Sequence, residues 1–201
     1  MESKKTMILD LDETLVHRSD DSNTLNRLNI WNQNPSLRAR TFSITWPDGT
    51  KSWLIKRPYL TEFLTSCFKH FDQVIVWSAG GKSYVDAVVT HIFSGLPNPH
   101  YVFCNHHCMN YELEYKKLHK PILHLKNYNV DIDINNTIIV DDREANFIDN
   151  VENGVKIREY TPFPSIAYIS ADNDDGLLEL IRWMNSTDFN RGMFTFRNWV
   201  S

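Results

Sequence analysis

Short apolar runs that end in polar or acidic residues alternate along this chain with segments of helical periodicity. The runs MILDLD, QVIVWSAG, HYVFC, NTIIVDDRE and GVKIRE predict buried strands, because continuous apolar residues mark strands covered on both faces. The segments RPYLTEFLTSCFKHF, GKSYVDAVVTHIF and DDGLLELIRWMN carry apolar residues at helical spacing, and PILHL predicts a short helix. This alternation predicts an α/β fold: a doubly wound, mostly parallel sheet with helices on both faces.

A β-hairpin interrupts the alternation after the first strand. Apolar and polar residues alternate in RTFSITW and again in KSWLIK, and PDG between them offers turn chemistry. The polar, Asn-rich stretch from Ser19 to Ser36 predicts a surface loop before the hairpin. We therefore expect one domain over residues 1–201, with an insertion at about 19–56. An aromatic C-terminal tail at about 188–201 is expected to pack back on the domain, with a dimer or partner contact as the alternative.

Composition narrows the class of protein. The 42% hydrophobic and 12% aromatic residues are typical of a globular chain, and the net charge of -4 gives no strong nucleic-acid signal. Three cysteines do not make a disulfide framework and indicate a reducing compartment. We find no signal peptide, transit peptide or transmembrane run, and therefore expect a cytoplasmic or nuclear protein with no membrane partner.

Polar side chains follow three of the predicted strands. Asp10 and Asp12 come after the first, Ser78 after the second, and Asp141 and Asp142 after the third. Because ligands of parallel sheets bind at the carboxyl ends of the strands, these residues should meet in one crevice.

The paired aspartates suggest a division of labour. If a cation holds Asp10 ionised, Asp10 can act as a nucleophile, while the like charge raises the pKa of Asp12 and lets it donate a proton. Asp141 would complete an oxygen cage suited to Mg²⁺. Lys120 offers a positive charge and Ser78 a hydroxyl group. Together these are the parts needed for phosphoryl transfer.

The segment DLDETLVH resembles the DxDxT signature of the haloacid dehalogenase superfamily. More narrowly, it resembles the phosphatases of the RNA polymerase II C-terminal domain, including their small-phosphatase branch. The segments KRPYLTEFL, VIVWSAGGKSYVDAVV, HKPILHL and TIIVDDREANF are similar to that family's further motifs, in the same order. The resemblance implies a Mg²⁺-dependent phosphoserine or phosphothreonine protein phosphatase that acts through an aspartyl-phosphate. It also implies a phosphorylated polypeptide substrate, with the RNA polymerase II C-terminal domain as one candidate.

The resemblance assigns a role to each catalytic candidate. Asp10 attacks phosphorus, and Asp12 protonates the leaving oxygen and then activates water. Thr14 and Ser78 hold the phosphoryl group. Lys120 balances charge, although the longer preceding segment makes Lys117 a competing choice.

The same resemblance implies the metal ligands and a substrate groove. Mg²⁺ would be held by Asp10, the Asp12 backbone carbonyl and Asp141, with Asp142 as a weaker candidate behind these ligands. Alternatively, Asp142 pairs with Arg143 or caps the next helix. The candidate groove residues are Trp46, Trp53 and Tyr84, with hairpin core as the alternative for the two tryptophans.

Other readings stay open. The family's substrate-contacting arginine has no clear counterpart in CNHHCMNYELEYKK, so hydrolysis of another phosphomonoester, a metabolite or a nucleic-acid end, remains an alternative. A non-catalytic peptide-binding module is another. The spacing of Cys104, Cys108, His119 and His124 also suggests zinc, but core or solvated positions are favoured for these residues. The sequence assigns no role to His106 or His107.

Overall fold

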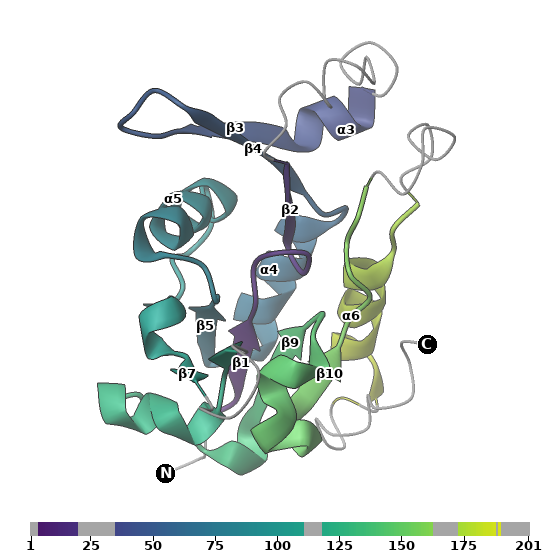
Figure 1. The fold of residues 1–201 in the computed structure, drawn as a ribbon. Helices are drawn as coiled ribbons and strands as arrows, with labels where there is room; N and C mark the ends of the chain where they lie inside the picture. The colour runs from purple at the N-terminus through teal and green to yellow at the C-terminus, as the bar shows by residue number, and fades with distance from the viewer. Residues whose placement is uncertain (1–3, 20–34, 111–117, 163–172, 188, 190–201) are drawn as a thin grey trace.

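A computed structural model describes residues 4–19, 35–110, 118–162, 173–187 and 189. Figure 1 shows the arrangement of its elements. In chain order they are β1 (Thr6–Leu9), β2 (Val16–Ser19), α3 (Pro35–Arg40), β3 (Thr41–Thr45), β4 (Lys51–Lys56), α4 (Leu60–His70), β5 (Gln73–Trp77), α5 (Lys82–Ile92), β6 (Tyr101–Phe103), the 3-10 helix η1 (Asn105–His107), β7 (Met109–Asn110), β8 (Leu118–His119), the 3-10 helices η2 (Ile122–Tyr128) and η3 (Ile134–Asn136), β9 (Thr137–Asp141), the 3-10 helix η4 (Glu144–Asn153), β10 (Gly154–Lys156) and α6 (Gly176–Met184).

A five-stranded parallel sheet forms the centre of the molecule, with strand order β10-β9-β1-β5-β6. The first strand lies in the middle, where Leu9 is level with Val76 of β5 and Val140 of β9. The carboxyl ends of β9, β1 and β5 therefore lie side by side. This confirms the predicted parallel α/β sheet and brings the three polar strand ends to one edge.

The two faces of the sheet pack against different layers. Since side chains alternate along a strand, neighbouring residues of β1 enter different cores. On one face, Leu9 packs with apolar residues of α4, α5 and α6. On the other, Ile8 packs with residues of η2 and η4. Helices cover both faces as predicted, but the second layer consists of 3-10 segments.

The insertion is a second, antiparallel sheet of order β2-β4-β3, which lies above the parallel sheet with α3 beside it (Figure 1). It contains the predicted hairpin, β3 and β4, and one more strand. The sequence missed β2 because its four residues, VHRS, include a single apolar one. It missed α3 for a similar reason, since Leu37 is the only buried residue of that helix.

Two further expectations, on membrane spans and on the aromatic tail, can be compared with the described residues only in part. Within the described ranges, no helix has the length and apolar character needed to cross a bilayer. Of the aromatic tail, only Phe189 is described, and its ring packs 5.0 Å from Trp183 and 5.6 Å from Phe71, centre to centre. The remainder of the tail, Lys117 and most of the Asn-rich loop lie outside the described residues.

Candidate active site

The chain leaves β1 through a tight loop that carries Asp10, Asp12 and Thr14. The backbone N–H of Asp10 donates to the Val140 carbonyl over 3.0 Å, so Asp10 still belongs to the sheet edge. Glu13 then adopts a φ of 60°, in the left-handed region that non-glycine residues rarely occupy. This turn is a strained conformation of the kind found at ligand-binding loops.

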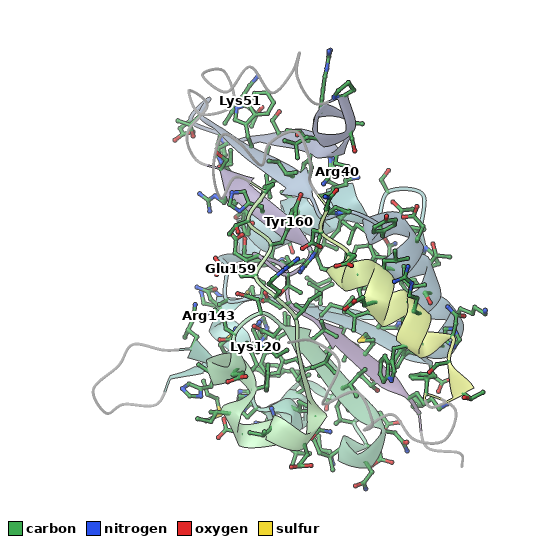
Figure 2. All side chains as sticks on the ribbon, turned by 90° about the vertical axis from the view of Figure 1, so that its right-hand side faces the viewer. Arg40, Lys51, Lys120, Arg143, Glu159 and Tyr160 are labelled. Atoms are coloured by element: carbon green, nitrogen blue, oxygen red, sulfur yellow. The ribbon has the colours of Figure 1, made fainter. Side chains whose placement is uncertain are left out.

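Lys120 lies fully buried between two carboxylates. Its Nζ donates to Asp10 Oδ1 over 2.5 Å and to Asp141 Oδ2 over 2.7 Å. Burial alone would lower the pKa of Lys120, but the charges of Asp10 and Asp141 outweigh it and leave the pKa raised. In Figure 2, Lys120 lies well below the insertion, close to Arg143. The structure thus places Lys120 between the strand ends that carry Asp10 and Asp141.

Asp141 is completely buried, and hydrogen bonds engage both of its oxygens. Besides Lys120, it accepts the Arg143 backbone N–H over 2.9 Å. The Asn146 amide donates to Asp141 Oδ1 over 2.8 Å and to Oδ2 over 2.9 Å. Sequence reasoning missed Asn146, whose only signal was its place in DDREANF. These bonds fix Asp141 as the group that holds Lys120 in position.

Asp142 is paired with Thr14 instead of Arg143. The Thr14 hydroxyl donates to Asp142 Oδ1 and accepts the Asp142 backbone N–H, each over 3.1 Å. Burial, together with the charge of Asp141, raises the pKa of Asp142 to about 6. The helix-capping reading is not supported either, because Arg143 is the residue that precedes η4. The hydroxyl of Thr14 therefore orients Asp142.

Asp12 is held by two hydroxyl groups from the second motif. Tyr84, at the start of α5, donates to Asp12 Oδ1, and Ser78 donates to Oδ2 over 3.3 Å. Burial raises the pKa of Asp12, while these two hydrogen bonds oppose the rise. Ser78 also accepts the Gly80 backbone N–H over 2.9 Å, so it stabilises the turn as well as facing the site. An oriented carboxyl with a raised pKa suits proton transfer.

Three carboxylates come close enough to share one cation. Ligand oxygens of Asp10, Asp141 and Asp142 all lie within 4.8 Å of one another. Burial raises the pKa of Asp10 to about 8, with the charge of Lys120 opposing this rise and that of Asp141 adding to it. When all three are ionised, Lys120 neutralises only one of their charges. A site of excess negative charge built from oxygen ligands fits a hard divalent cation such as Mg²⁺.

A buried arginine that the sequence analysis did not single out ties this loop to the C-terminal part of the chain. Arg57 is fully buried, and its Nη1 donates to the Thr14 carbonyl over 3.1 Å. Its Nε and Nη2 bind the two oxygens of Asp174 over 2.7 and 2.9 Å. Tyr160 adds a second tie, since its backbone N–H donates to the Glu13 carbonyl over 2.7 Å. Figure 2 shows Tyr160 close to Arg40 at the base of the insertion, and Arg40 donates to its hydroxyl over 2.8 Å.

Only part of the predicted groove is assembled. The Trp46 ring lies 6.5 Å from that of Tyr84, and its Nε1 donates to Ser52 Oγ over 3.0 Å. Trp53 follows Ser52 directly in β4, so its side chain points to the opposite face of the sheet. Trp53 therefore lies on the face of the sheet opposite to Trp46, and its place in a substrate groove stays a prediction.

The zinc alternative finds no support among the described residues. There, the acidic cluster is the only group with three candidate ligands in mutual reach. Cys104 is buried in the hydrophobic core, and its Sγ lies 3.5 Å from His107 Nδ1. The favoured reading of Cys104 as a core residue agrees with this placement.

A parallel sheet with an aspartate pair after its first strand, a buried lysine and an acidic third strand end defines the haloacid dehalogenase-like class. The chain belongs within it to the NLI interacting factor-like phosphatase family, whose model matches residues 5–193.

Named relatives agree with this membership. The chain is 29% identical over 147 residues to a ubiquitin-like domain-containing CTD phosphatase 1 of Xenopus tropicalis, covering 65% of this chain and 41% of the relative. It is 27% identical over 158 residues to a probable C-terminal domain small phosphatase of Dictyostelium discoideum, covering 76% of this chain and 43% of the relative. The chain thus spans less than half the length of these two relatives.

A solved structure shows the same fold. The RNA polymerase II CTD phosphatase Fcp1 superposes with a TM-score of 0.58 at 21% identity, over 90% of this chain and 49% of that one.

Proposed function

We propose that this protein is a Mg²⁺-dependent phosphatase that removes phosphate from phosphoserine or phosphothreonine in a polypeptide. The observation that carries the proposal is the pairing of Asp10, held by buried Lys120, with a separately oriented Asp12. In the first arrangement the charge of Lys120 favours the ionised form of Asp10 against the effect of burial, and in the second burial raises the pKa of an Asp12 carboxyl that two hydroxyl groups orient. Family membership and the names of the relatives support a phosphatase and a phosphorylated polypeptide, with the RNA polymerase II C-terminal domain as a candidate.

Asp10 would act as the nucleophile. Its carboxylate oxygen forms a bond to phosphorus while the bond from phosphorus to the seryl or threonyl oxygen breaks. Asp12 gives its proton to that leaving oxygen, which departs as the alcohol. The product is an aspartyl-phosphate on Asp10.

Hydrolysis would reverse the role of Asp12. Its carboxylate takes a proton from water, which attacks phosphorus and breaks the bond to Asp10. Inorganic phosphate is released, and Asp12 is protonated again for the next cycle. In this mechanism Lys120 would balance the charge of the transferred group, and the buried Ser78 hydroxyl would hold it by a hydrogen bond.

The metal ligands that we propose differ in one member from the set that the sequence suggested. Asp141 uses both oxygens for Lys120, Asn146 and a backbone N–H, whereas the carboxylate of Asp142 engages one hydroxyl among the described residues. We therefore assign Mg²⁺ to Asp10, Asp142 and the Asp12 backbone carbonyl. When bound, the ion would supply positive charge that lowers the repulsion between the carboxylates and the phosphoryl group.

The test is hydrolysis of p-nitrophenyl phosphate with Mg²⁺. Asp10→Asn should abolish turnover, because an amide cannot form the acyl phosphate, and wild type should form an acid-stable, hydroxylamine-sensitive phosphoenzyme that the variant lacks. Asp131→Asn is the matched control, since Asp131 is an exposed carboxylate paired with Lys4. If Asp10→Asn kept most of the wild-type turnover, Asp10 would not be the nucleophile.

A further inference from the structure

A lysine lies on the side of the insertion that faces α5, away from the acidic site. Lys56, the last residue of β4, is half-buried, and its Nζ lies 5.8 Å from the centre of the Phe42 ring. Among the described residues, no ion pair involves Lys56. Burial lowers the pKa of Lys56. A partly desolvated cation without a counter-ion gains free energy when an anion binds beside it.

A second group that can carry positive charge comes from α5. The His91 ring stacks on Phe42 with 3.9 Å between ring centres and an angle of 9°. Partial burial lowers the pKa of His91, and the charge of Lys56 lowers it further. Lys56 and His91 therefore meet at Phe42. When both are protonated they repel each other, and an anion placed there would relieve this repulsion.

The strand pairing fixes how far this point lies from the chemistry. Asp12 forms a β-bridge with Val16, and Val16 is paired with Lys56. Because paired strands lie about 4.8 Å apart, the backbone of Lys56 is at most about 10 Å from the backbone of Asp12.

The helix relates His91 to the acid through Tyr84. Tyr84 contacts Asp12, and His91 lies seven residues further along α5. At a rise of about 1.5 Å per residue, His91 lies about 10 Å from Tyr84 along the helix axis.

The charge of the insertion fits an anionic partner. Its described strands and helix contain no acidic residue, and the turn between β3 and β4 adds one, Asp48, whereas the whole chain has a net charge of -4. Their basic residues are Arg18, Arg38, Arg40, Lys51 and Lys56. Of these, Arg18 lies over the Tyr84 ring, 5.1 Å from its centre.

We propose that Lys56 and His91 form a second anion subsite, which binds another phosphorylated side chain of the polypeptide whose phosphate Asp10 attacks. An extended peptide advances about 3.3 Å per residue, so a distance of about 10 Å corresponds to about three residues. The preferred substrate therefore carries two phosphoryl groups about three residues apart. This inference rests on the proposed function, because it needs a peptide held at Asp10.

The experiment compares kcat/KM for synthetic phosphopeptides of one sequence. One peptide has a single phosphoserine, two carry a second phosphoserine three residues before or after it, and one has the second phosphoserine adjacent. For one of the peptides with three-residue spacing, wild type should have a kcat/KM about fivefold higher than for the singly phosphorylated peptide. This is the effect expected of one partly exposed charge-assisted contact. Glutamate in place of the second phosphoserine distinguishes recognition of phosphate from recognition of any negative charge.

Variants locate the effect. Lys56→Gln should bring the ratio of doubly to singly phosphorylated peptide close to one, and His91→Gln should lower it. Lys51→Gln is the matched control, because Lys51 starts the same strand on the opposite face and lies far out on the insertion in Figure 2. A wild-type ratio near one would overturn the subsite. A ratio in Lys56→Gln equal to that of wild type would overturn it as well.

Failure of the subsite and failure of the proposed function give different results. Absence of p-nitrophenyl phosphate turnover by wild type would reject the enzyme, whereas turnover without peptide preference would reject only the subsite. If no peptide is hydrolysed, fluorescence anisotropy with the same labelled peptides replaces kcat/KM. Equal affinities for singly and doubly phosphorylated peptides would then reject the subsite.

Discussion

Removing the carboxylate of Asp174 should destabilise the fold far more than an ordinary surface substitution. Asp174 forms a bidentate ion pair with Arg57, whose side chain is 0% exposed, while that of Asp174 is 9% exposed. Asp174→Asn keeps the shape of the side chain but leaves the guanidinium buried without its counter-ion. Breaking a buried pair in this way costs about 3–5 kcal/mol. We expect the lower end, about 3 kcal/mol, because the Thr14 and Arg158 carbonyls still accept from Arg57.

Urea unfolding followed by circular dichroism measures this loss. At a slope of about 3 kcal/mol per molar, a loss of about 3 kcal/mol moves the midpoint down by about 1 M. Arg158→Ala is the control, because Arg158 lies 3.7 Å from Asp174 but is 69% exposed, so its pair should contribute below about 1 kcal/mol. The double variant Arg57→Met/Asp174→Leu should lose less unfolding free energy than Asp174→Asn, since it leaves no unpaired charge. Equal midpoints for Asp174→Asn and Arg158→Ala would refute the reasoning.

Two more predictions concern the site itself. The pKa values of about 8 for Asp10 and about 6 for Asp142 mean that Mg²⁺ must displace protons, so its affinity should rise from pH 6 to pH 8. Raised carboxyl pKa values also mean that the metal-free protein loses stability as pH rises through them. The shift in melting temperature on adding Mg²⁺ should therefore be larger at pH 8 than at pH 6, and equal shifts would contradict the assignment. Separately, Gly80→Ala places a Cβ 2.8 Å from Tyr84 Cδ1 and 3.2 Å from Ser78 Oγ, so kcat should fall about tenfold through a displaced Asp12. Gly81→Ala, which meets no atom within 4 Å, should retain most of the activity, and similar losses in both variants would show that crowding at Tyr84 is not the cause.

The sequence predicted the central sheet well, because a parallel sheet leaves a strong pattern. Strands buried on both faces are continuous apolar runs, and β1, β5 and β9 all show them. Each run ends in a polar residue at the carboxyl edge, so Asp10, Ser78 and Asp141 could be expected to meet before any coordinates were known. The insertion was harder to predict, since β2 and α3 are short and each buries a single apolar side chain.

Residues that hold the site were harder to find than residues that face it. Arg57 and Asp174 lie 117 positions apart, and the local pattern around neither residue indicates that they pair. Thr14 and Asp142 are 128 positions apart, so their mutual hydrogen bonds could not be read from spacing. Such contacts depend on how β1, the insertion and the segment before α6 close on each other, and local periodicity carries no information about this.

The division between Asp141 and Asp142 separates two carboxylates that motif spacing alone cannot distinguish. Adjacent residues at a strand end have side chains that point to opposite sides, so only one can be drawn into the core beside Lys120. Asp141 takes that place and is 0% exposed, which commits its oxygens to a lysine, an amide and a backbone N–H. Asp142 is left at the rim, where Thr14 turns its carboxylate toward Asp10. The acid pair of the third strand therefore mirrors that of the first: one member is fixed by Lys120, and a hydroxyl group orients the other.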